Sequence, residues 1–249
     1  MRIPRMVFPD SPATVSTRQG CRPDFLPRVV PFVAFLSFIA LGPLWEWASG
    51  EISSSGGGTS QVNLWLYPVK TLVVGSLLLF FWTRFRELQN PIFASWGEGL
   101  QAIGVGLLVY YMWVQMDWPW AIQGELSGYE PFQAGPTIGL ALVAIRIFGA
   151  SIVVPIMEEL FWRSFLIRYI IHSNFESVRL GTFTAGSFLF TVVLFGLEHN
   201  LWLAGMMAGA AYNALLYRTG RLWPCIIAHA ITNLALGIHV LMTGEWHWW

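Results

Sequence analysis

The chain has 249 residues, of which 55% are hydrophobic and 16% aromatic, while only 11% are charged. Soluble globular domains carry about a quarter charged residues, so this composition excludes that class and indicates a polytopic membrane protein. Lys plus Arg and Asp plus Glu balance at 14 each. We expect the lipid bilayer, and no nucleic acid, among its partners.

Residues 1–27 are polar, contain prolines and show no periodic pattern. No apolar segment follows their first arginines, so they do not have the organisation of a secretory signal peptide. We predict a cytoplasmic N-terminal tail for this segment.

Seven apolar runs follow the tail, and each approaches the roughly 20 residues that a helix needs to cross a bilayer. The sequence therefore predicts an all-α fold, a polytopic transmembrane bundle of about seven to eight helices. The runs lie at 29–48, 64–83, 98–116, 138–157, 182–199, 200–217 and 222–242.

The arginines are distributed unevenly between the predicted loops. Five precede the first run, and others follow the second and fourth runs or separate the last two, whereas the segments 49–63 and 117–136 contain no Lys or Arg. By the positive-inside rule the N-terminus is cytoplasmic, and seven spans place the C-terminal tail on the other side.

Ionisable side chains inside a membrane are costly and mark functional sites. Lys70 lies near the start of its run, where its ammonium can extend to the surface. Arg146 lies deeper and has no partner in the local sequence; it can pair with a carboxylate of another helix or line a cavity. His239 lies near the end of the last run, where we expect an interfacial position.

The segment "IMEELFWRSF" places two carboxylates and an arginine in apolar sequence. Glu159 and Arg163 are four residues apart, which on a helix brings them into ion-pair range. Glu158 lies about 100° round the helix from its neighbour and is free to face a cavity.

Two later runs carry polar residues at the same helical spacing. Phe195 precedes His199 by four residues in "FGLEH", and His229 precedes Asn233 by four in "HAITN". Three predicted helices therefore each present polar groups from one face.

The three motifs "EELFWR", "FGLEH" and "HAITN", in this order, resemble the CPBP family of intramembrane proteases, which includes the Ras-converting type of CAAX prenyl endopeptidase. The N-terminal half is similar to the CAAX-protease-related proteins that accompany bacterial exosortase systems. Glu198 departs from the family pattern, which has an uncharged residue there. The resemblance implies a peptidase whose catalytic set is Glu158, Glu159, Arg163, His199, His229 and Asn233.

With this resemblance the chain divides into four parts. The tail 1–27 precedes N-terminal transmembrane helices at 28–136, a CPBP-like protease core at 137–243 and a C-terminal tail at 244–249. We expect an integral protein of the bacterial inner membrane that acts on a membrane-associated peptide or protein substrate.

Peptide hydrolysis needs a base that activates water and donors that stabilise the oxyanion. We expect Glu158 to be the base and His199 to orient the water. His229 and Asn233 would donate to the oxyanion. Glu159 and Arg163 would form a structural ion pair. This scheme requires no cofactor.

Two alternatives remain open. Glu158, His199 and His229 form a His₂Glu set of the kind that binds catalytic zinc, so the same residues could serve a zinc-dependent protease. A non-catalytic membrane scaffold or partner-binding protein could also retain buried polar residues. The sequence contains no HExxH or G-x-S-x-G motif.

The catalytic scheme sets a condition on helix length. If the fourth run ended near residue 167, Glu158 would lie only roughly 13 Å below the surface, far from the predicted depth of His199. A single helix from about residue 138 to about residue 171 would place Glu158 roughly 20 Å deep. We therefore predict this long helix, with a kink at Pro155, beside a polar cavity.

Overall fold

The computed structural model describes residues 24–49, 61–124, 126 and 128–249. Within these residues the regular structure consists of helices and one isolated antiparallel bridge, between Ile122 and Leu201. The predicted all-α fold is therefore confirmed. The predicted tail 1–27 lies outside the described residues except for its last four. The α-helices are α1 (Leu26–Ser49), α2 (Gln61–Phe80), α3 (Trp96–Trp113), α4 (Pro136–Phe148), α5 (Val154–Glu159), α6 (Ile167–Ile171), α7 (Ala185–Leu197), α8 (Trp202–Thr219) and α9 (Leu222–Thr243).

Helices α4, α5 and α6 form one continuous helix of 36 residues, Pro136–Ile171. Two π-helical segments, Gly149–Val153 and Leu160–Leu166, join its three parts. Pro155 lies two residues after the end of the first segment and has no N–H to donate, so a wider turn before it accommodates the missing hydrogen bond. The long helix that the catalytic scheme required is confirmed.

Among the described residues, four helices are long and apolar enough to cross a membrane, at 26–45, 62–80, 136–171 and 222–243. Helices α3 and α8 have 18 residues each, and α7 has only 13. The predicted run 182–199 is thus too long. Thr184 caps α7 by accepting a hydrogen bond from the backbone N–H of Ser187, which fixes the start of the helix.

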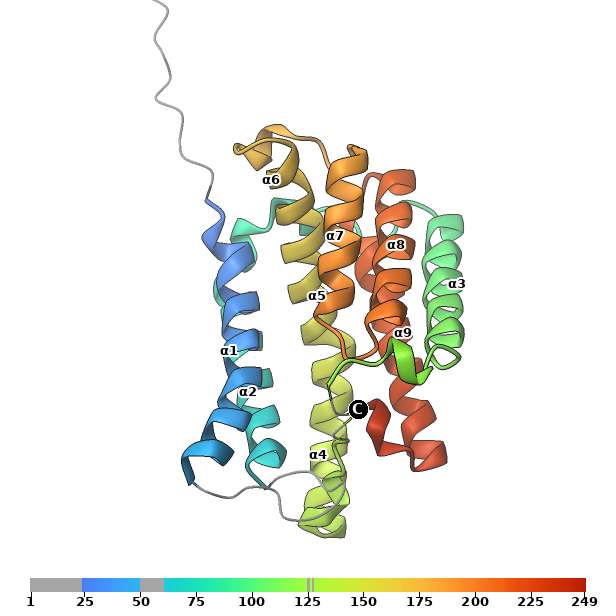
Figure 1. Ribbon diagram of the computed structural model, residues 1–249. Coiled ribbons are helices and arrows are strands. Elements are labelled where there is room, and N and C mark those ends of the chain that lie inside the picture. The colour runs from blue at the N-terminus through green and yellow to red at the C-terminus, as the bar shows by residue number, and fades with distance from the viewer. Residues whose placement is uncertain (1–23, 50–60, 125, 127) are drawn as a thin grey trace, which may run out of the picture.

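The long helix stands in the middle of the bundle (Figure 1), with α1 and α2 on one side and α7, α8, α9 and α3 on the other. Helix α3 packs on α9, α7 on α8, and α5 on α9. One apolar cluster includes Phe32 from α1, Met157 from α5 and Tyr212 from α8, so the N-terminal helices share a core with the later ones.

The shortness of α7 sets the depth of the turn that follows it. Thirteen residues rise roughly 20 Å, and the long helix rises about the same distance from Ile171 back to Glu158. The turn between α7 and α8 accordingly lies beside the middle part of the long helix (Figure 1). This brings His199, which lies in the turn, to the level of Glu158.

Glycines allow α7 and α8 to approach closely. A Cβ added at Gly205 would lie 2.9 Å from the Cα of Gly196 and 3.2 Å from Nδ1 of His199. Such small residues at crossing points let helix backbones pack directly in membranes.

The segment between α3 and α4 forms hydrogen bonds with the turn between α7 and α8. Gln123 donates its backbone N–H to the carbonyl of Asn200 at 2.7 Å. Its side-chain amide donates to the carbonyls of Leu197 and His199 at 2.8 and 2.9 Å. The backbone around His199 is therefore held by a second element.

The C-terminal tail folds back onto the bundle after α9. Gly244 ends α9 in the left-handed conformation at φ +73°. The tail then forms a short 3₁₀ turn at Trp246–Trp248. Trp248 and Trp249 line the same cavity as Glu158.

Candidate active site

A cavity of about 190 Å³ lies between the long helix and helices α7, α8 and α9. Four of the six predicted site residues line it: Glu158, His199, His229 and Asn233. The other two lie next to it in a buried network described below. The remaining lining residues are Trp113, Arg146, Ala150, Val154, Phe195, Ala208, Tyr212, Thr232, Leu236, Trp248 and Trp249.

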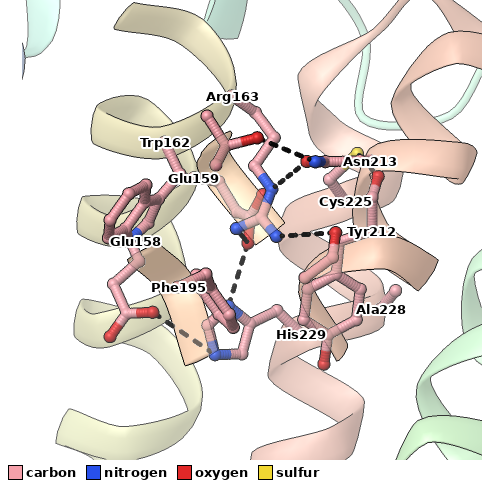
Figure 2. Close-up of polar contacts among 12 residues, drawn as sticks. Glu158, Glu159, Trp162, Arg163, Phe195, Tyr212, Asn213, Cys225, Ala228 and His229 are labelled. Atoms are coloured by element: carbon pink, nitrogen blue, oxygen red, sulfur yellow. Dashed lines mark hydrogen bonds and ion pairs between the residues drawn. The ribbon is translucent and has the colours of Figure 1, made fainter. Parts of the chain in front are cut away.

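Glu158 is buried, at 4% exposure, and faces the last helix. Its Oε2 lies 4.0 Å from Nε2 of His229, as Figure 2 shows. This oxygen has no hydrogen-bond partner among the described residues. A buried acceptor without a donor is unfavourable, so the site favours a bound group that supplies one.

Glu159 is completely buried. Its Oε1 accepts from Nη1 of Arg163 at 3.0 Å, so the predicted ion pair is confirmed. The same oxygen also accepts from Nδ1 of His229 at 3.0 Å. Glu159 therefore links the ion pair to a cavity residue, a contact that the spacing of the motifs does not reveal.

Arg163 extends this network to helix α8. Its Nε donates to Oδ1 of Asn213 at 3.1 Å, and its Nη2 donates to the carbonyl of Gly209 at 3.4 Å. Asn213 in turn donates to the hydroxyl of Thr191 at 3.0 Å. Asn213 and Thr191 carry no sequence signal of this role, because neither belongs to a motif with helical spacing.

His229 is held by contacts on its edge and on its face. Tyr212 stacks on the ring, with centroids 5.1 Å apart and planes inclined by 21°. The hydroxyl of Tyr212 donates to Thr232 at 2.8 Å. Because Glu159 accepts the Nδ1 hydrogen, Nε2 is the nitrogen presented to Glu158.

His199 has one tautomer that its surroundings support. Its Nδ1 lies 2.7 Å from the carbonyl oxygen of Phe195, which can only accept. Nδ1 therefore carries the hydrogen, and in the neutral ring Nε2 is an acceptor. The rings of Phe195 and Trp113 lie 4.8 and 5.4 Å from the imidazole and restrict its rotation.

Asn233 lines the cavity, but one of its two amide hydrogens is already used. Its Nδ2 donates to the carbonyl of Ala150 at 2.8 Å. Ala150 lies in the first π-helical segment, so the irregular turn of the long helix orients this amide. One N–H and the Oδ1 of Asn233 remain for a ligand.

The side chains of Lys70 and Glu198 both make contacts inside the bundle. Lys70 does not extend to the surface; its ammonium lies 4.1 Å from the ring centre of Phe35 and 4.9 Å from that of Tyr67. Glu198 does not face solvent freely, because Trp162 donates to its Oε2 at 3.2 Å and its Oε1 is buried.

The cavity residues have the chemistry of zinc ligands, since Nε2 of both histidines and the Glu158 carboxylate are uncommitted to backbone groups. In the part of the chain that the structure describes, however, no three His, Cys, Asp or Glu side chains gather closely enough to hold a metal ion. The geometry thus presents two histidines and a carboxylate around a space for water.

Comparison with protein-family models matches residues 140–235 to the type II CAAX prenyl endopeptidase Rce1-like family. This segment contains all three motifs and every residue of the predicted catalytic set. No curated protein and no solved structure matches the chain. Residues 140–235 thus resemble an Rce1-like domain, which is consistent with a CPBP-family intramembrane protease and indicates a peptidase, and the apolar helices indicate an integral membrane protein.

Proposed function

We propose that the protein is an intramembrane endopeptidase in which Glu158 activates the attacking water. The observation that carries this proposal is the Glu158 carboxylate itself. It is buried, its Oε2 has no hydrogen-bond partner among the described residues, and it lines a cavity together with two histidines. Such a carboxylate can take a proton from water within a protected space.

The proposed reaction has two proton transfers. Water attacks the carbonyl carbon of the scissile bond while Glu158 takes one of its protons, and His199 orients the water through Nε2. Glu158 then gives the proton to the leaving amine nitrogen as the C–N bond breaks. The products are a new amine and a new carboxylic acid, which then releases its proton to water.

Donors for the oxyanion come from helix α9. The second amide hydrogen of Asn233 is free to donate. His229 donates through Nε2 when its ring is doubly protonated, and the neighbouring Glu159 carboxylate stabilises that imidazolium. Preorganised donors of this kind contribute about 10²- to 10³-fold each to the rate of acyl transfer.

We propose that this hydrolysis needs no metal. The amide of Asn233 beside His229 suits an oxyanion better than a cation. A zinc ion held by Glu158, His199 and His229 is the rival mechanism. It predicts that 1,10-phenanthroline abolishes cleavage and that added zinc restores it.

The orientation and location are also proposals. Arg28, Arg84, Arg168 and Arg218 lie at or near the start of α1, the ends of α2 and α6, and the end of α8, all at one end of the bundle (Figure 1). By the positive-inside rule this end is cytoplasmic. We propose a bacterial inner-membrane protein whose substrate is a membrane-associated peptide or protein.

The test is peptide proteomics of membranes and secreted material from cells that carry wild type or Glu158→Gln. We expect the variant to stay folded in the membrane and to lose cleavage by about 10²- to 10⁴-fold, the usual contribution of a general base. The matched control is Glu176→Gln, the same change at an exposed carboxylate after α6; it should cleave as wild type does.

Retained cleavage by Glu158→Gln would show that the assignment is wrong. A non-catalytic scaffold gives a different result: wild type and Glu158→Gln would produce identical peptides, and both would capture the same partner protein. The two outcomes separate the peptidase from the partner-binding alternative.

A further inference from the structure

Arg146 lines the same cavity as Glu158, from the α4 part of the long helix. Its Nε is buried and has no hydrogen-bond partner in the part of the chain that the structure describes. The ion pairs among the described residues do not include Arg146. An arginine at membrane depth without a counter-charge is costly, so its retention indicates a ligand that supplies one.

Aromatic rings hold the guanidinium in place. The Cζ atom of Arg146 lies 4.2 Å from the ring centre of Tyr67, 4.9 Å from that of Tyr129 and 5.9 Å from that of Trp249. Ring faces attract the cation but do not use the N–H groups in the plane of the guanidinium. These rings can therefore position Arg146 while leaving donors for a ligand.

The rings are themselves fixed. The hydroxyl of Tyr67 donates to the backbone carbonyl of Arg146 at 3.3 Å, and that of Tyr129 donates to the carbonyl of Leu64 at 3.1 Å. Both hydroxyls thus donate to backbone oxygens, and the Tyr67 hydroxyl also lies within hydrogen-bonding reach of the Arg146 side chain, whose guanidinium has further donors. The site is a cation in a preformed aromatic cage, open to the cavity.

We propose that Arg146 is a substrate-binding residue that pairs with a carboxylate of the peptide while Glu158 acts on the scissile bond. This proposal rests on the proposed peptidase function and adds a substrate class to it. The carboxylate is either the free C-terminus of the peptide or an acidic side chain. Both offer the planar pair of oxygens that a guanidinium binds best.

The distance between the two groups limits where the carboxylate lies. From residue 146 to residue 158 the helix rises roughly 18 Å at about 1.5 Å per residue. An extended peptide covers about 3.3 Å per residue. The carboxylate therefore lies within about five residues of the cleaved bond.

No other Lys or Arg side chain among the described residues lines this cavity. Lys70 lies close to the same Tyr67 ring but is not part of the cavity wall. Arg146 is accordingly the residue whose change should alter recognition of a negative charge.

The experiment uses the full-length protein in lipid nanodiscs and two random decapeptide libraries. One library has a free C-terminal acid and the other a C-terminal amide, and each is made with and without Asp and Glu. Cleavage products are measured by mass spectrometry. In parallel, the Glu158→Gln protein selects binding peptides from the same libraries without depending on turnover.

We expect wild type to favour carboxylate-bearing peptides. Arg146→Gln should lower cleavage of those peptides by about tenfold to hundredfold, the usual effect of losing a charged hydrogen bond, and should remove the preference. Arg146→Lys should keep part of it, because the charge remains but the bidentate geometry is lost. Arg179→Gln, an exposed arginine after α6, is the matched control and should behave as wild type.

The pattern of preference identifies the source of the carboxylate. A preference for the acid library that persists without Asp and Glu indicates the C-terminus, whereas a preference for Asp or Glu within the amide library indicates a side chain. If Arg146→Gln discriminates as wild type does, in cleavage and in selection, the proposal is overturned. If Glu158→Gln still cleaves but selects carboxylates through Arg146, only the peptidase assignment fails.

Discussion

Glu158 and Glu159 are adjacent on one helix, but their carboxylates meet opposite surroundings. Oε1 of Glu159 lies in a network that reaches Arg163 and His229. Oε2 of each acid lacks a hydrogen-bond partner in the described chain, but only Glu158 lines the cavity. The rotation of about 100° between successive helical residues makes this separation possible. A pair of neighbouring acids can thus serve both the fold and the reaction.

The same contrast applies to two arginines of the long helix, the buried Arg163 and the half-buried Arg146. Arg163 is 1% exposed and donates to a carboxylate, an amide and a backbone carbonyl. Arg146 is caged by rings, and its Nε has no acceptor among the described residues. Arg163 thus connects helices through its donors, whereas Arg146 lines the cavity with an Nε that lacks an acceptor in the described chain.

The largest expected difference between the two acids appears when each is replaced by its amide. Glu159→Gln leaves Arg163 buried without a counter-charge, so we expect it to lower the free energy of unfolding by about 3–5 kcal/mol. Glu158→Gln removes a charge that has no hydrogen-bonded partner and should change this free energy far less. Reversible unfolding in mixed micelles, followed by tryptophan fluorescence, measures both.

Equal destabilisation by the two amides would contradict the division between network and cavity. A second outcome would do the same: a Glu159→Gln protein as stable as wild type. Because both variants alter one helix by the same chemical change, each is the control for the other.

A smaller effect is expected at the wall of the cavity. Gly205→Ala would bring its new methyl group to 2.9 Å from Cα of Gly196 and 3.2 Å from Nδ1 of His199. We expect the overpacked contact to cost about 1–3 kcal/mol in unfolding free energy and to displace His199 from the cavity. The cleavage rate should therefore fall by more than the loss of folded protein explains.

Gly186→Ala is the matched control, because a Cβ at Gly186 of α7 meets nothing within 4 Å. It should keep full activity and gain slightly in helix stability. If Gly205→Ala cleaves as fast as the Gly186→Ala control, close packing of α7 on α8 is not what positions His199.

The ion pair and the long helix could be predicted from the sequence because both depend on the spacing of residues within one segment. Four-residue spacing predicted the pair of Glu159 and Arg163, and the depth of the polar residues required a helix that continues past residue 167. Apolar runs located all seven helical regions. These features depend on periodicity and on bilayer thickness, which act along a single segment.

Contacts between distant segments could not be predicted in the same way. Asn213 accepts a hydrogen bond from Arg163, which lies 50 residues earlier in the chain. Gly205 lies close to His199 because α8 packs against the end of α7. The ring of Trp249 reaches Arg146 only because the C-terminal tail folds back. Each depends on three-dimensional packing, for which the residue types alone give no spacing rule.

The smallest predicted effect concerns the ion pair of Glu87, a residue that lies between α2 and α3, outside the membrane-spanning helices. Arg28 donates to both carboxylate oxygens of Glu87, each at 2.8 Å, and Ser164 also donates to this acid. Burial alone would raise the pKa of Glu87, but the hydrogen bonds and charge of Arg28 outweigh it and hold the pKa below its ordinary value of 4.5.

A lowered pKa in the folded state makes the stability depend on pH in one direction. The contribution of Glu87 is complete above its unfolded pKa and is lost as the pH falls through the folded value, because protonation then breaks the pair with Arg28. Unfolding midpoints should fall as the pH drops below about 4.5 in wild type and less steeply in Glu87→Gln. If the midpoints of wild type and Glu87→Gln change with pH by the same amount, the pair of Glu87 with Arg28 does not contribute to the free energy of unfolding.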